Sequence, residues 1–388
     1  MRMRVVVAPD KFKGSASAAQ VAAAIAAGLR RARPDLDVVE MPVADGGDGT
    51  VAAALAAGFA PVRTTAEGPT AEGPTAEGPT AERVQATFAL KAGTAVVELA
   101  DVAGLRRLPG ARPAPLTAST YGVGQVIAAA LDRGATTIVL GIGGSATTDG
   151  GAGMVQALGV RLADERGRDL PRGGAALRDL AAVDLAGLDR RIAGVRLLVA
   201  SDVDNKLLGT AGAAVVFGPQ KGASPADVAL LDGALARWSA LTASVTGLDL
   251  AAAPGAGAAG GTGFAAMTYL GARLVPGADL VLDLIGFDAA LTGARLVITG
   301  EGSLDRQSLG GKAPVGVARA AARHGVPVAV VAGRIQLTAR ELAAAGFAAA
   351  YSLADLEPDP AVSIAAAAEL LERVGGQVAL GPLVASVT

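Results

Sequence analysis

Short apolar runs rich in β-branched residues alternate with alanine-rich amphipathic segments at both ends of this chain. In the first sixty residues, predicted strands at 5–8 and 38–42 are each followed by a predicted helix, at 17–31 and 50–57. The last hundred residues continue the pattern, with strands in ARLVITG, VPVAVVAG and AAAYSL and a final helix from Pro360 to about Val374. Strand–helix alternation of this kind predicts a parallel sheet covered by helices on both faces.

The middle of the chain carries a second set of elements. The runs VQATFAL and TAVVELA alternate in polarity and predict a hairpin joined around Ala92–Gly93. Further strands are predicted at 136–140, 195–200 and 213–217, and a long helix is predicted after Ser224. We therefore expect an α/β fold. Residues 1–60 and 290–388 are predicted to form a doubly wound parallel-sheet domain of the Rossmann or flavodoxin type, discontinuous in sequence. Residues 61–289 are predicted to form an inserted α/β domain that carries a glycine-rich loop.

A five-residue repeat interrupts the inserted part. Residues 66–82 read AEGPTAEGPTAEGPTAE, a period far too short for a solenoid. A proline in every unit prevents a continuous helix. We therefore predict an exposed, mobile surface loop here.

Composition limits the classes of function. The 388 residues suggest two domains, and the 51% apolar content is distributed without a run of about 18 apolar residues that could span a bilayer. The N-terminus has too few apolar residues before Pro9 for a signal peptide. Because the chain has no cysteine, disulfides and thiolate chemistry are excluded, and a cytoplasmic location is expected. A net charge of −2 and 3% aromatic residues argue against nucleic acid and membranes as partners.

The main candidate for chemistry is the stretch IVLGIGGSATTDGGAG at 138–153. A predicted strand ends there in a glycine-rich loop. Because glycine has no side chain and readily adopts positive φ, successive N–H groups of such a loop can point at one anion. Ser145 adds a hydroxyl and Asp149 a carboxylate. We interpret the loop as a phosphate or carboxylate cradle, although a tight turn in a glycine-rich chain is the alternative.

Other candidate residues also follow predicted strands. Lys11, Lys13 and Ser15 precede a helix N-terminus whose capping box is Ser17 and Gln20, the general arrangement of an anion site. Asp45 and Asp48 lie among glycines and could hold a hard cation or accept a proton. Asp202 and Asp204 form a second pair, spaced so that both carboxylates could face a cation. Lys221 comes just before the helix that Ser224 caps. Because ligands of doubly wound sheets bind beyond the carboxyl ends of the strands, we expect these loops to share one site between the domains.

This inventory fits phosphoryl transfer, which needs mainly positioning and charge neutralisation. Two other functions stay open. Gly141, Gly143 and Ala146 match the dinucleotide fingerprint G-x-G-x-x-G/A, with Asp164 about twenty residues on, so an NAD(P)-dependent dehydrogenase is an alternative. A non-catalytic sensor of small anions is the other.

Eight ordered motifs, among them APDKFKGSASA, MPVADGGDGT, LGIGGSATTDGGAGM and ITGEGSLDRQSLGGKAPVGVA, resemble the type I bacterial glycerate kinases. The resemblance covers nearly the whole chain. It implies ATP-dependent phosphorylation of D-glycerate with Mg²⁺, usually to 2-phosphoglycerate, on a two-domain α/β fold. Two departures are Thr148, where the family often has Asn, and Ser303, where it often has Arg. The sequence leaves the oligomeric state open, a homo-oligomer included.

The roles that follow are hypotheses. Lys11, Lys13 and Ser15 bind phosphate or the substrate carboxylate, and Asp45 is the base near the attacked hydroxyl. Gly141, Gly143, Gly144 and Ser145 bind phosphate, and Lys221 adds a positive charge. Asp202 and Asp204 hold Mg²⁺. The cleft is completed by Glu301, Asp305 and Lys312.

Overall fold

The computed structural model describes residues 2–72 and 80–385. The chain packs as two units, each described by itself below. Unit 1 comprises residues 1–45, 52–58 and 276–388, and unit 2 comprises residues 46–51 and 59–275. Both units mix helices with largely parallel strands, so the predicted α/β class is confirmed.

Unit 1 is built on a five-stranded parallel sheet with the order β13-β12-β11-β1-β2. Its strands are β1 (Arg4–Pro9), β2 (Asp37–Glu40), β11 (Ala294–Leu304), β12 (Val328–Ile335) and β13 (Ala349–Ser352). Counted in chain order, this is the flavodoxin-like arrangement 2-1-3-4-5. The order reverses between β1 and β11, so the loops that follow these two strands leave in opposite directions. We call this switch point, at the carboxyl ends of β1 and β11, the crevice of unit 1, because ligands of doubly wound sheets bind at such a point.

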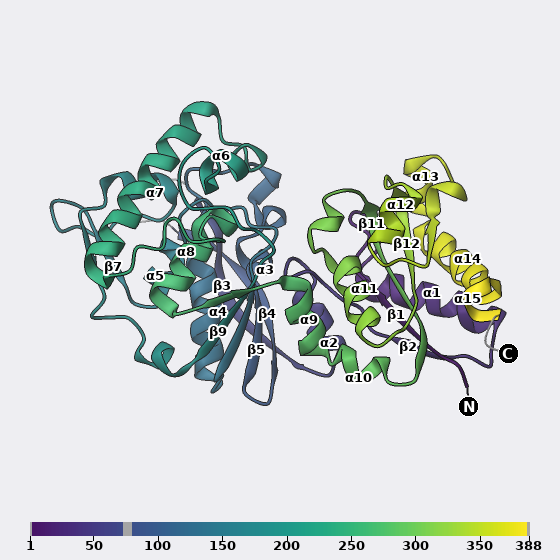
Figure 1. The fold of residues 1–388 in the computed structure, drawn as a ribbon. Helices are drawn as coiled ribbons and strands as arrows, with labels where there is room; N and C mark the ends of the chain where they lie inside the picture. The colour runs from purple at the N-terminus through teal and green to yellow at the C-terminus, as the bar shows by residue number, and fades with distance from the viewer. Residues whose placement is uncertain (1, 73–79, 386–388) are drawn as a thin grey trace. The chain divides into compact units, whose positions relative to one another are not determined.

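Helices cover both faces of this sheet (Figure 1), because its strands are apolar on both sides. Val5 and Val7 pack with α1 (Ala18–Ala32) and α14 (Ala367–Leu380), whereas Val6 and Ala8 pack with the helices of the other face. The predicted capping box of Ser17 and Gln20 starts α1. The remaining helices of unit 1 are α9 (Gly277–Ile285), α10 (Phe287–Leu291), α11 (Ala313–Arg323), α12 (Ala339–Ala344), α13 (Pro360–Ala365) and α15 (Pro382–Ala385); α2 (Thr50–Ala56) begins in unit 2 and ends in unit 1.

Unit 2 contains a six-stranded sheet with the order β10-β9-β6-β5-β4-β3. Its strands are β3 (Ala60–Glu72), β4 (Thr80–Lys91), β5 (Thr94–Glu98), β6 (Thr137–Gly141), β9 (Arg196–Ala200) and β10 (Arg273–Val275), and a separate ribbon pairs β7 (Arg161–Ala163) with β8 (Ala182–Asp184). In the six-stranded sheet β5, β6, β9 and β10 run parallel, whereas β4 pairs antiparallel with both β3 and β5. The predicted hairpin between β4 and β5 is confirmed, with Ala92 and Gly93 both at positive φ.

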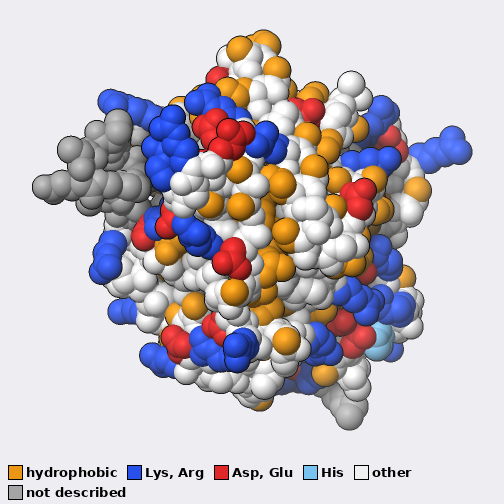
Figure 2. Space-filling model, turned by 90° about the vertical axis from the view of Figure 1, so that its left-hand side faces the viewer, with side chains coloured by type: hydrophobic (Ala, Val, Ile, Leu, Met, Phe, Trp, Pro, Cys, Tyr) orange, Lys and Arg blue, Asp and Glu red, His pale blue; other side chains and the backbone are white. Residues whose placement is uncertain are grey.

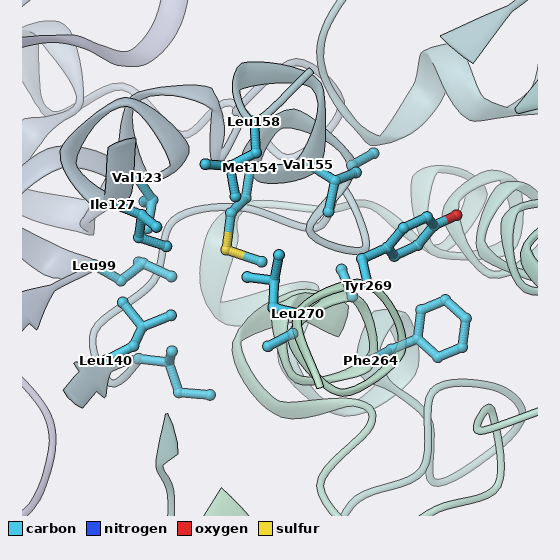
Figure 3. Close-up of a cluster of buried hydrophobic side chains, with 14 of the residues drawn as sticks. Leu99, Val123, Ile127, Leu140, Met154, Val155, Leu158, Phe264, Tyr269 and Leu270 are labelled. Atoms are coloured by element: carbon cyan, nitrogen blue, oxygen red, sulfur yellow. The ribbon is translucent and has the colours of Figure 1, made fainter. Parts of the chain in front are cut away.

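The helices of unit 2 are α3 (Ala100–Ala103), α4 (Tyr121–Asp132), α5 (Ala152–Ala157), α6 (Ala213–Phe217), α7 (Pro225–Thr246) and α8 (Ala258–Leu270). Side chains from α4, α5 and α8 point into one buried cluster, in which Met154 lies among Val123, Ile127 and Leu270 (Figure 3). Trp238 of α7 is fully buried in the same cluster and donates a hydrogen bond from its indole N–H to the Gly150 carbonyl at 3.1 Å. The core therefore packs directly beneath the glycine-rich loop.

Two predicted elements differ from the structure. Residues 213–217 form the helix α6 rather than a strand, and only its two alanines are buried, while Val215 and Val216 are 38% and 43% exposed. A short β-branched run does not distinguish the two states without a pairing partner. The predicted final helix is two helices, α13 and α14, interrupted at Ala366 and extended to Leu380.

The described ends of the repeat, residues 66–72 and 80–82, belong to strands and not to the surface loop that the sequence predicts. Its first copy, residues 66–70, lies inside β3, and the backbone pairs Ala66 with Val84 and Glu67 with Arg83 on β4. After a register shift the pairing resumes at Ala71 with Ala81. Residues 73–79 of the repeat lie outside the described residues. Proline is tolerated because this is the edge strand of the sheet, where one row of N–H groups needs no strand partner.

The first repeat copy also packs on the start of α4. Ala66 is 2% exposed, and the Pro69 carbonyl accepts a hydrogen bond from the Ser119 amide at 2.7 Å. Glu67 forms an ion pair with Arg172, whose guanidinium lies 3.3 Å from the centre of the Tyr121 ring. Gly122 is required here, because a Cβ at that position would stand 1.9 Å from the Glu67 carbonyl oxygen. Copy one is thus part of the packed fold.

Deleting residues 71–80, which are two of the three repeat units, should leave kcat and KM within about twofold and Tm nearly unchanged. The remaining AEGPT keeps the packed copy, and closure entropy changes only slowly with loop length. Steady-state kinetics and thermal melting of the shortened protein check this. Removing residues 66–80 instead should lower Tm, because it deletes the copy that packs on α4. A tenfold loss of kcat in the first deletion would contradict the prediction.

The surface carries no long stretch of one sign on the face that Figure 2 shows, where positive and negative side chains are interspersed. The ion pairs Arg161–Asp169 and Arg168–Asp164 are examples of this mixing. In the part of the chain that the structure describes, no helix is both long and apolar enough to cross a membrane.

Candidate functional site

Carboxyl groups from three segments of unit 1 gather at the crevice between β1 and β11. Asp10 follows β1 and its amide donates to the Gly300 carbonyl at 2.8 Å, while Asp45 follows β2, whose loop is tied back by the Val43 amide to the Pro9 carbonyl at 3.0 Å. Glu301 lies within β11 itself, which extends to Leu304, beyond the predicted strand. Asp10 and Glu301 are 6% and 7% exposed. The strand-end loops of this unit are therefore brought together as expected.

Asp10 was not among the candidate residues from the sequence. Burial raises its pKa to about 7, and the negative charges of Asp45 and Glu301 act in the same direction. Lys11 opposes them: its Nζ lies 3.6 Å from Asp10 Oδ1, and its amide donates to the same oxygen at 2.6 Å. An acid placed directly after the first strand of a doubly wound sheet was the available signal.

Glu301 is the second buried acid of this cluster. Burial raises its pKa, Asp45 and Asp305 add to the effect, and the Ser308 hydroxyl and Lys312 lower it. Lys312 Nζ stands 3.7 Å from Glu301 Oε2, and within the described residues Glu301 Oε1 is buried with no hydrogen-bond partner. A buried acceptor left in this state costs free energy, so it marks a place where a donor from outside the chain would be favourable.

The other candidates of unit 1 have smaller roles in the geometry. Lys13 and Ser15 are exposed, and the Ser15 hydroxyl donates to the Phe12 carbonyl at 3.1 Å. Asp305 accepts bonds from the amides of Gln307 and Ser308 at 2.8 and 3.2 Å, which makes it the first residue of a turn. Asp305 therefore stabilises its own loop.

Replacing Asp10 with asparagine should raise the free energy of unfolding at pH 8 by at least about 1 kcal/mol. The folded-state pKa near 7 lies above the ordinary 3.8, so the folded state binds more protons than the unfolded state between these values. The contribution of Asp10 to the free energy of unfolding is therefore largest below pH 4, and it is lost as the pH rises through about 7. Asparagine lacks this titration, so the stability difference should grow from pH 5 to pH 8.

Denaturant unfolding of both proteins at pH 5 and pH 8 checks this, and Asp355→Asn, at an exposed position, is the control. Other buried acids such as Glu98, whose pKa burial raises to about 7, contribute equally to both proteins and cancel. A difference that is the same at both pH values would show that Asp10 titrates normally.

The glycine-rich loop of unit 2 is shaped by backbone packing. A Cβ on Gly141 would stand 2.7 Å from the Gly46 carbonyl oxygen, and one on Gly143 would stand 2.6 Å from the Gly47 Cα. The Gly143 amide already donates to the Gly46 carbonyl at 3.3 Å, and Gly144 takes a φ of +75°. Close approach of the 46–47 backbone thus explains Gly141 and Gly143, and anion binding by this loop stays a prediction.

The segment after Asp45 is held in unit 2 by Glu98. This carboxyl accepts bonds from the amides of Gly49 and Val51 at 3.1 and 3.2 Å, and Asp48 forms an ion pair with Arg106. Asp48 is therefore paired within unit 2, whereas Asp45 belongs to unit 1.

Asp149, which the sequence places in the cradle, is a structural acid. It is fully buried, and its carboxylate accepts four bonds, from the Thr120 amide and hydroxyl at 2.8 and 2.9 Å and from the amides of Gly151 and Gly153 at 3.2 Å each. Burial raises its pKa and these four bonds lower it. Asp149 ties the loop to the starts of α4 and α5.

Lys221 is 2% exposed, so its side chain lies within the fold. Its Nζ donates to the Thr147 carbonyl, and burial lowers its pKa to about 8 while the Asp149 charge raises it. The neighbouring Thr148 hydroxyl is buried with no partner among the described residues. Ser145 Oγ and Thr147 Oγ1 lie 2.9 Å apart and share a hydrogen bond. As placed, Lys221 supports the glycine-rich loop from below.

Asp202 and Asp204 both lie exposed in the loop after β9. Among the described residues there is no group of three or more acidic, histidine or cysteine side chains suited to a metal. Mg²⁺ commonly uses only one or two carboxylates, with water and substrate phosphates completing its shell. This pair of carboxylates fits that requirement. The expectation that the loops of the two units form one shared site stays a prediction.

Comparison with known proteins gives one consistent result. A family model described as the glycerate kinase family matches residues 5–381. The chain is 44% identical over 352 residues to a glycerate kinase of Halalkalibacterium halodurans, covering 90% of each chain, and 43% identical over 336 residues to the glycerate 2-kinase of Escherichia coli, covering 86% of each. A crystal structure from Salmonella typhimurium LT2, described as a candidate glycerate kinase 2, superposes with a TM-score of 0.83 at 41% identity and 98% coverage of both chains.

Proposed function

The chain belongs to the glycerate kinase family, and on that premise we propose that it transfers the γ-phosphoryl group of ATP to the 2-hydroxyl of D-glycerate. A bond forms between the hydroxyl oxygen and phosphorus, the bond from phosphorus to ADP breaks, and the hydroxyl proton leaves. The observation that carries the 2-position is the similarity to the E. coli glycerate 2-kinase. Family membership favours this kinase over the NAD(P)-dependent dehydrogenase and the anion sensor.

In unit 1, Asp45 is proposed to take the proton from the attacked hydroxyl. It belongs to the cluster with Asp10 and Glu301, because its charge raises the pKa of both. The positive charges proposed to hold anionic groups of the ligands are those of Lys11 and Lys13, with Ser15 contributing a hydroxyl. Proton removal by a positioned carboxylate is typically worth 10²–10⁴-fold in rate.

In unit 2, the backbone of Gly141–Ser145 is proposed to bind phosphate, and Asp202 with Asp204 is proposed to hold Mg²⁺. The supporting observation is that the latter two carboxylates stand exposed and one residue apart after β9. When bound, Mg²⁺ neutralises charge on the transferring phosphate. We further propose that the two packed units correspond to the two domains expected from the sequence, at 1–60 with 290–388 and at 61–289, with residues 46–51 and 59–60 belonging to unit 2 and residues 276–289 to unit 1.

The test is the product itself. Purified protein with ATP, Mg²⁺ and D-glycerate should release ADP and give the phosphorus NMR spectrum of 2-phosphoglycerate, and EDTA should abolish turnover. A 3-phosphoglycerate spectrum would reject the proposed position while keeping the enzyme class. No ADP release above background with D-glycerate or related hydroxy acids would reject the kinase proposal.

A further inference from the structure

Two loose lysine–carboxylate pairs lie beside one another at the crevice of unit 1. Lys11 Nζ is 3.6 Å from Asp10 Oδ1, and Lys312 Nζ is 3.7 Å from Glu301 Oε2, both wider than a direct hydrogen bond. The pairs are neighbours because β1 and β11 are hydrogen-bonded in register, with Pro9 opposite Gly300. Within each pair, the ammonium group attracts the carboxyl from beyond hydrogen-bond distance, and Asp10 Oδ1 accepts its hydrogen bond from the Lys11 amide instead.

Glu301 supplies a second, independent indication of a ligand. Its Oε1 has no partner among the described residues although the side chain is only 9% exposed. Lys312, at 35% exposed, is the solvent-side member of this pair. A ligand that brings a hydroxyl donor to Glu301 and an anionic group to Lys312 would enter by displacing the lysine head. Such a ligand would give Glu301 a hydrogen-bond donor and Lys312 an acceptor at hydrogen-bond distance, which the two side chains at 3.7 Å do not give each other.

The charges indicate which ligand this is. Three carboxyls, those of Asp10, Asp45 and Glu301, face two lysines, Lys11 and Lys312, with Asp305 adding further negative charge at Glu301. An excess of negative charge disfavours a nucleoside triphosphate, whose phosphates carry several charges at close spacing. A small acid with one carboxylate and neighbouring hydroxyls matches this mixture, because lysines attract the carboxylate and acids accept from the hydroxyls.

We propose that these two pairs form the hydroxy-acid subsite of the enzyme, in which the lysines hold the carboxylate and Glu301 accepts a hydrogen bond from the hydroxyl that is not phosphorylated. Asp10 orients Lys11 through its charge and through the hydrogen bond that it accepts from the Lys11 amide. This proposal rests on the proposed function and deepens it, since it assigns the acceptor substrate to unit 1 and makes Glu301 a specificity-determining residue. Asp45 remains the proposed proton acceptor beside the other hydroxyl.

The test compares the two substrates in the full-length enzyme. Glu301→Met should lower kcat/KM for D-glycerate at least a hundredfold and leave KM for ATP–Mg²⁺ within about twofold. The variant should melt no lower than the unmodified protein, because methionine removes a buried acceptor that lacks a partner. Glu369→Met, at an exposed position on α14, is the matched control and should change neither constant.

A probe that lacks one hydroxyl separates recognition from a merely structural role. D-lactate retains the carboxylate and the 2-hydroxyl but has no 3-hydroxyl. The unmodified enzyme should bind D-glycerate at least tenfold more tightly than D-lactate, measured as KM against inhibition constant, and Glu301→Met should abolish this preference. If the methionine variant fails to fold by circular dichroism, Glu301→Gln serves instead, with a loss of kcat/KM for D-glycerate of about tenfold and the same unchanged KM for ATP.

The outcomes are distinct. A raised KM for ATP with an unchanged KM for D-glycerate would place the nucleotide at these pairs and overturn the proposal, and so would a Glu301 variant that keeps its preference for D-glycerate. An unmodified protein that forms no ADP would instead reject the proposed function, before any variant is compared.

Discussion

Asp45→Asn is expected to lower kcat by about 10²–10⁴-fold with little change in KM for ATP–Mg²⁺. The proton of the attacked hydroxyl must leave as the new oxygen–phosphorus bond forms, and an amide cannot accept it. Binding of either substrate does not need that acceptor, so the loss appears in the chemical step. Asn preserves the size of the side chain, and the position is only half-buried, so the fold should persist.

Asp202→Asn is the comparison that separates the two acids. It should weaken Mg²⁺ binding, and its activity should recover partly as Mg²⁺ is raised, because mass action refills a weakened site. Measuring kcat against Mg²⁺ for both variants, with melting curves beside them and Asp355→Asn as a control, tests both roles. Rescue of the Asp45 variant, but not the Asp202 variant, by Mg²⁺ would show that the two roles are exchanged. A low Tm with normal kcat for Asp45→Asn would mean that Asp45 only forms a turn.

Lys221→Met should produce the largest loss of stability, roughly 2–4 kcal/mol in the free energy of unfolding. The variant removes the charged hydrogen bond from Nζ to the Thr147 carbonyl and takes away a positive charge that acts on buried Asp149. Methionine fills a similar volume, so little of the loss comes from a cavity. Denaturant unfolding at pH 7 measures the effect.

A double variant identifies the cause. In Lys221→Met/Asp149→Asn no buried acid is left without its counter-charge, so the double variant should lose less than the sum of the two single losses. Strict additivity would show that the two charges do not interact. The pH dependence gives a second check. The folded-state pKa of Lys221 near 8 lies below the ordinary 10.5, so its contribution to stability rises with pH between these values and should vanish in the Met variant.

Local patterns in the sequence were sufficient for most of the fold. The predicted capping box at Ser17 and the predicted cap at Ser224 mark real helix starts, because each satisfies amide groups that the first turn leaves free. Strand–helix alternation also predicted the parallel sheet of unit 1, because the hydrophobic period of a strand differs from that of a helix. The misassigned segment at 213–217 shows the limit, because five residues are too few for either period to show.

The site was less predictable, because burial and pairing are properties of the folded chain. The sequence indicated that acids and lysines follow strands, and this is correct for Lys11 and Asp45, whereas Glu301 lies within β11, which is longer than predicted. It could not indicate that the Asp149 carboxylate accepts four hydrogen bonds from the protein itself, or that the Lys221 side chain is buried. Their partners are Thr120 for Asp149 and Thr147 for Lys221, which lie 29 and 74 residues away along the chain.

The discontinuity of unit 1 has a consequence for how the chain is made. The interior strand β1 leaves the ribosome early, yet its partner β11 and helix α14, which packs on α1 through Gly28 and Gly375, lie about 290 and 350 residues later. The strands of unit 2 all lie between residues 60 and 275, so its sheet can pair fully before β11 emerges. We therefore expect unit 2 to resist protease in nascent chains that end near residue 310, while α1 is still cleaved. During synthesis, α1 and β1 therefore lack their packing partners until the final third of the chain has been made.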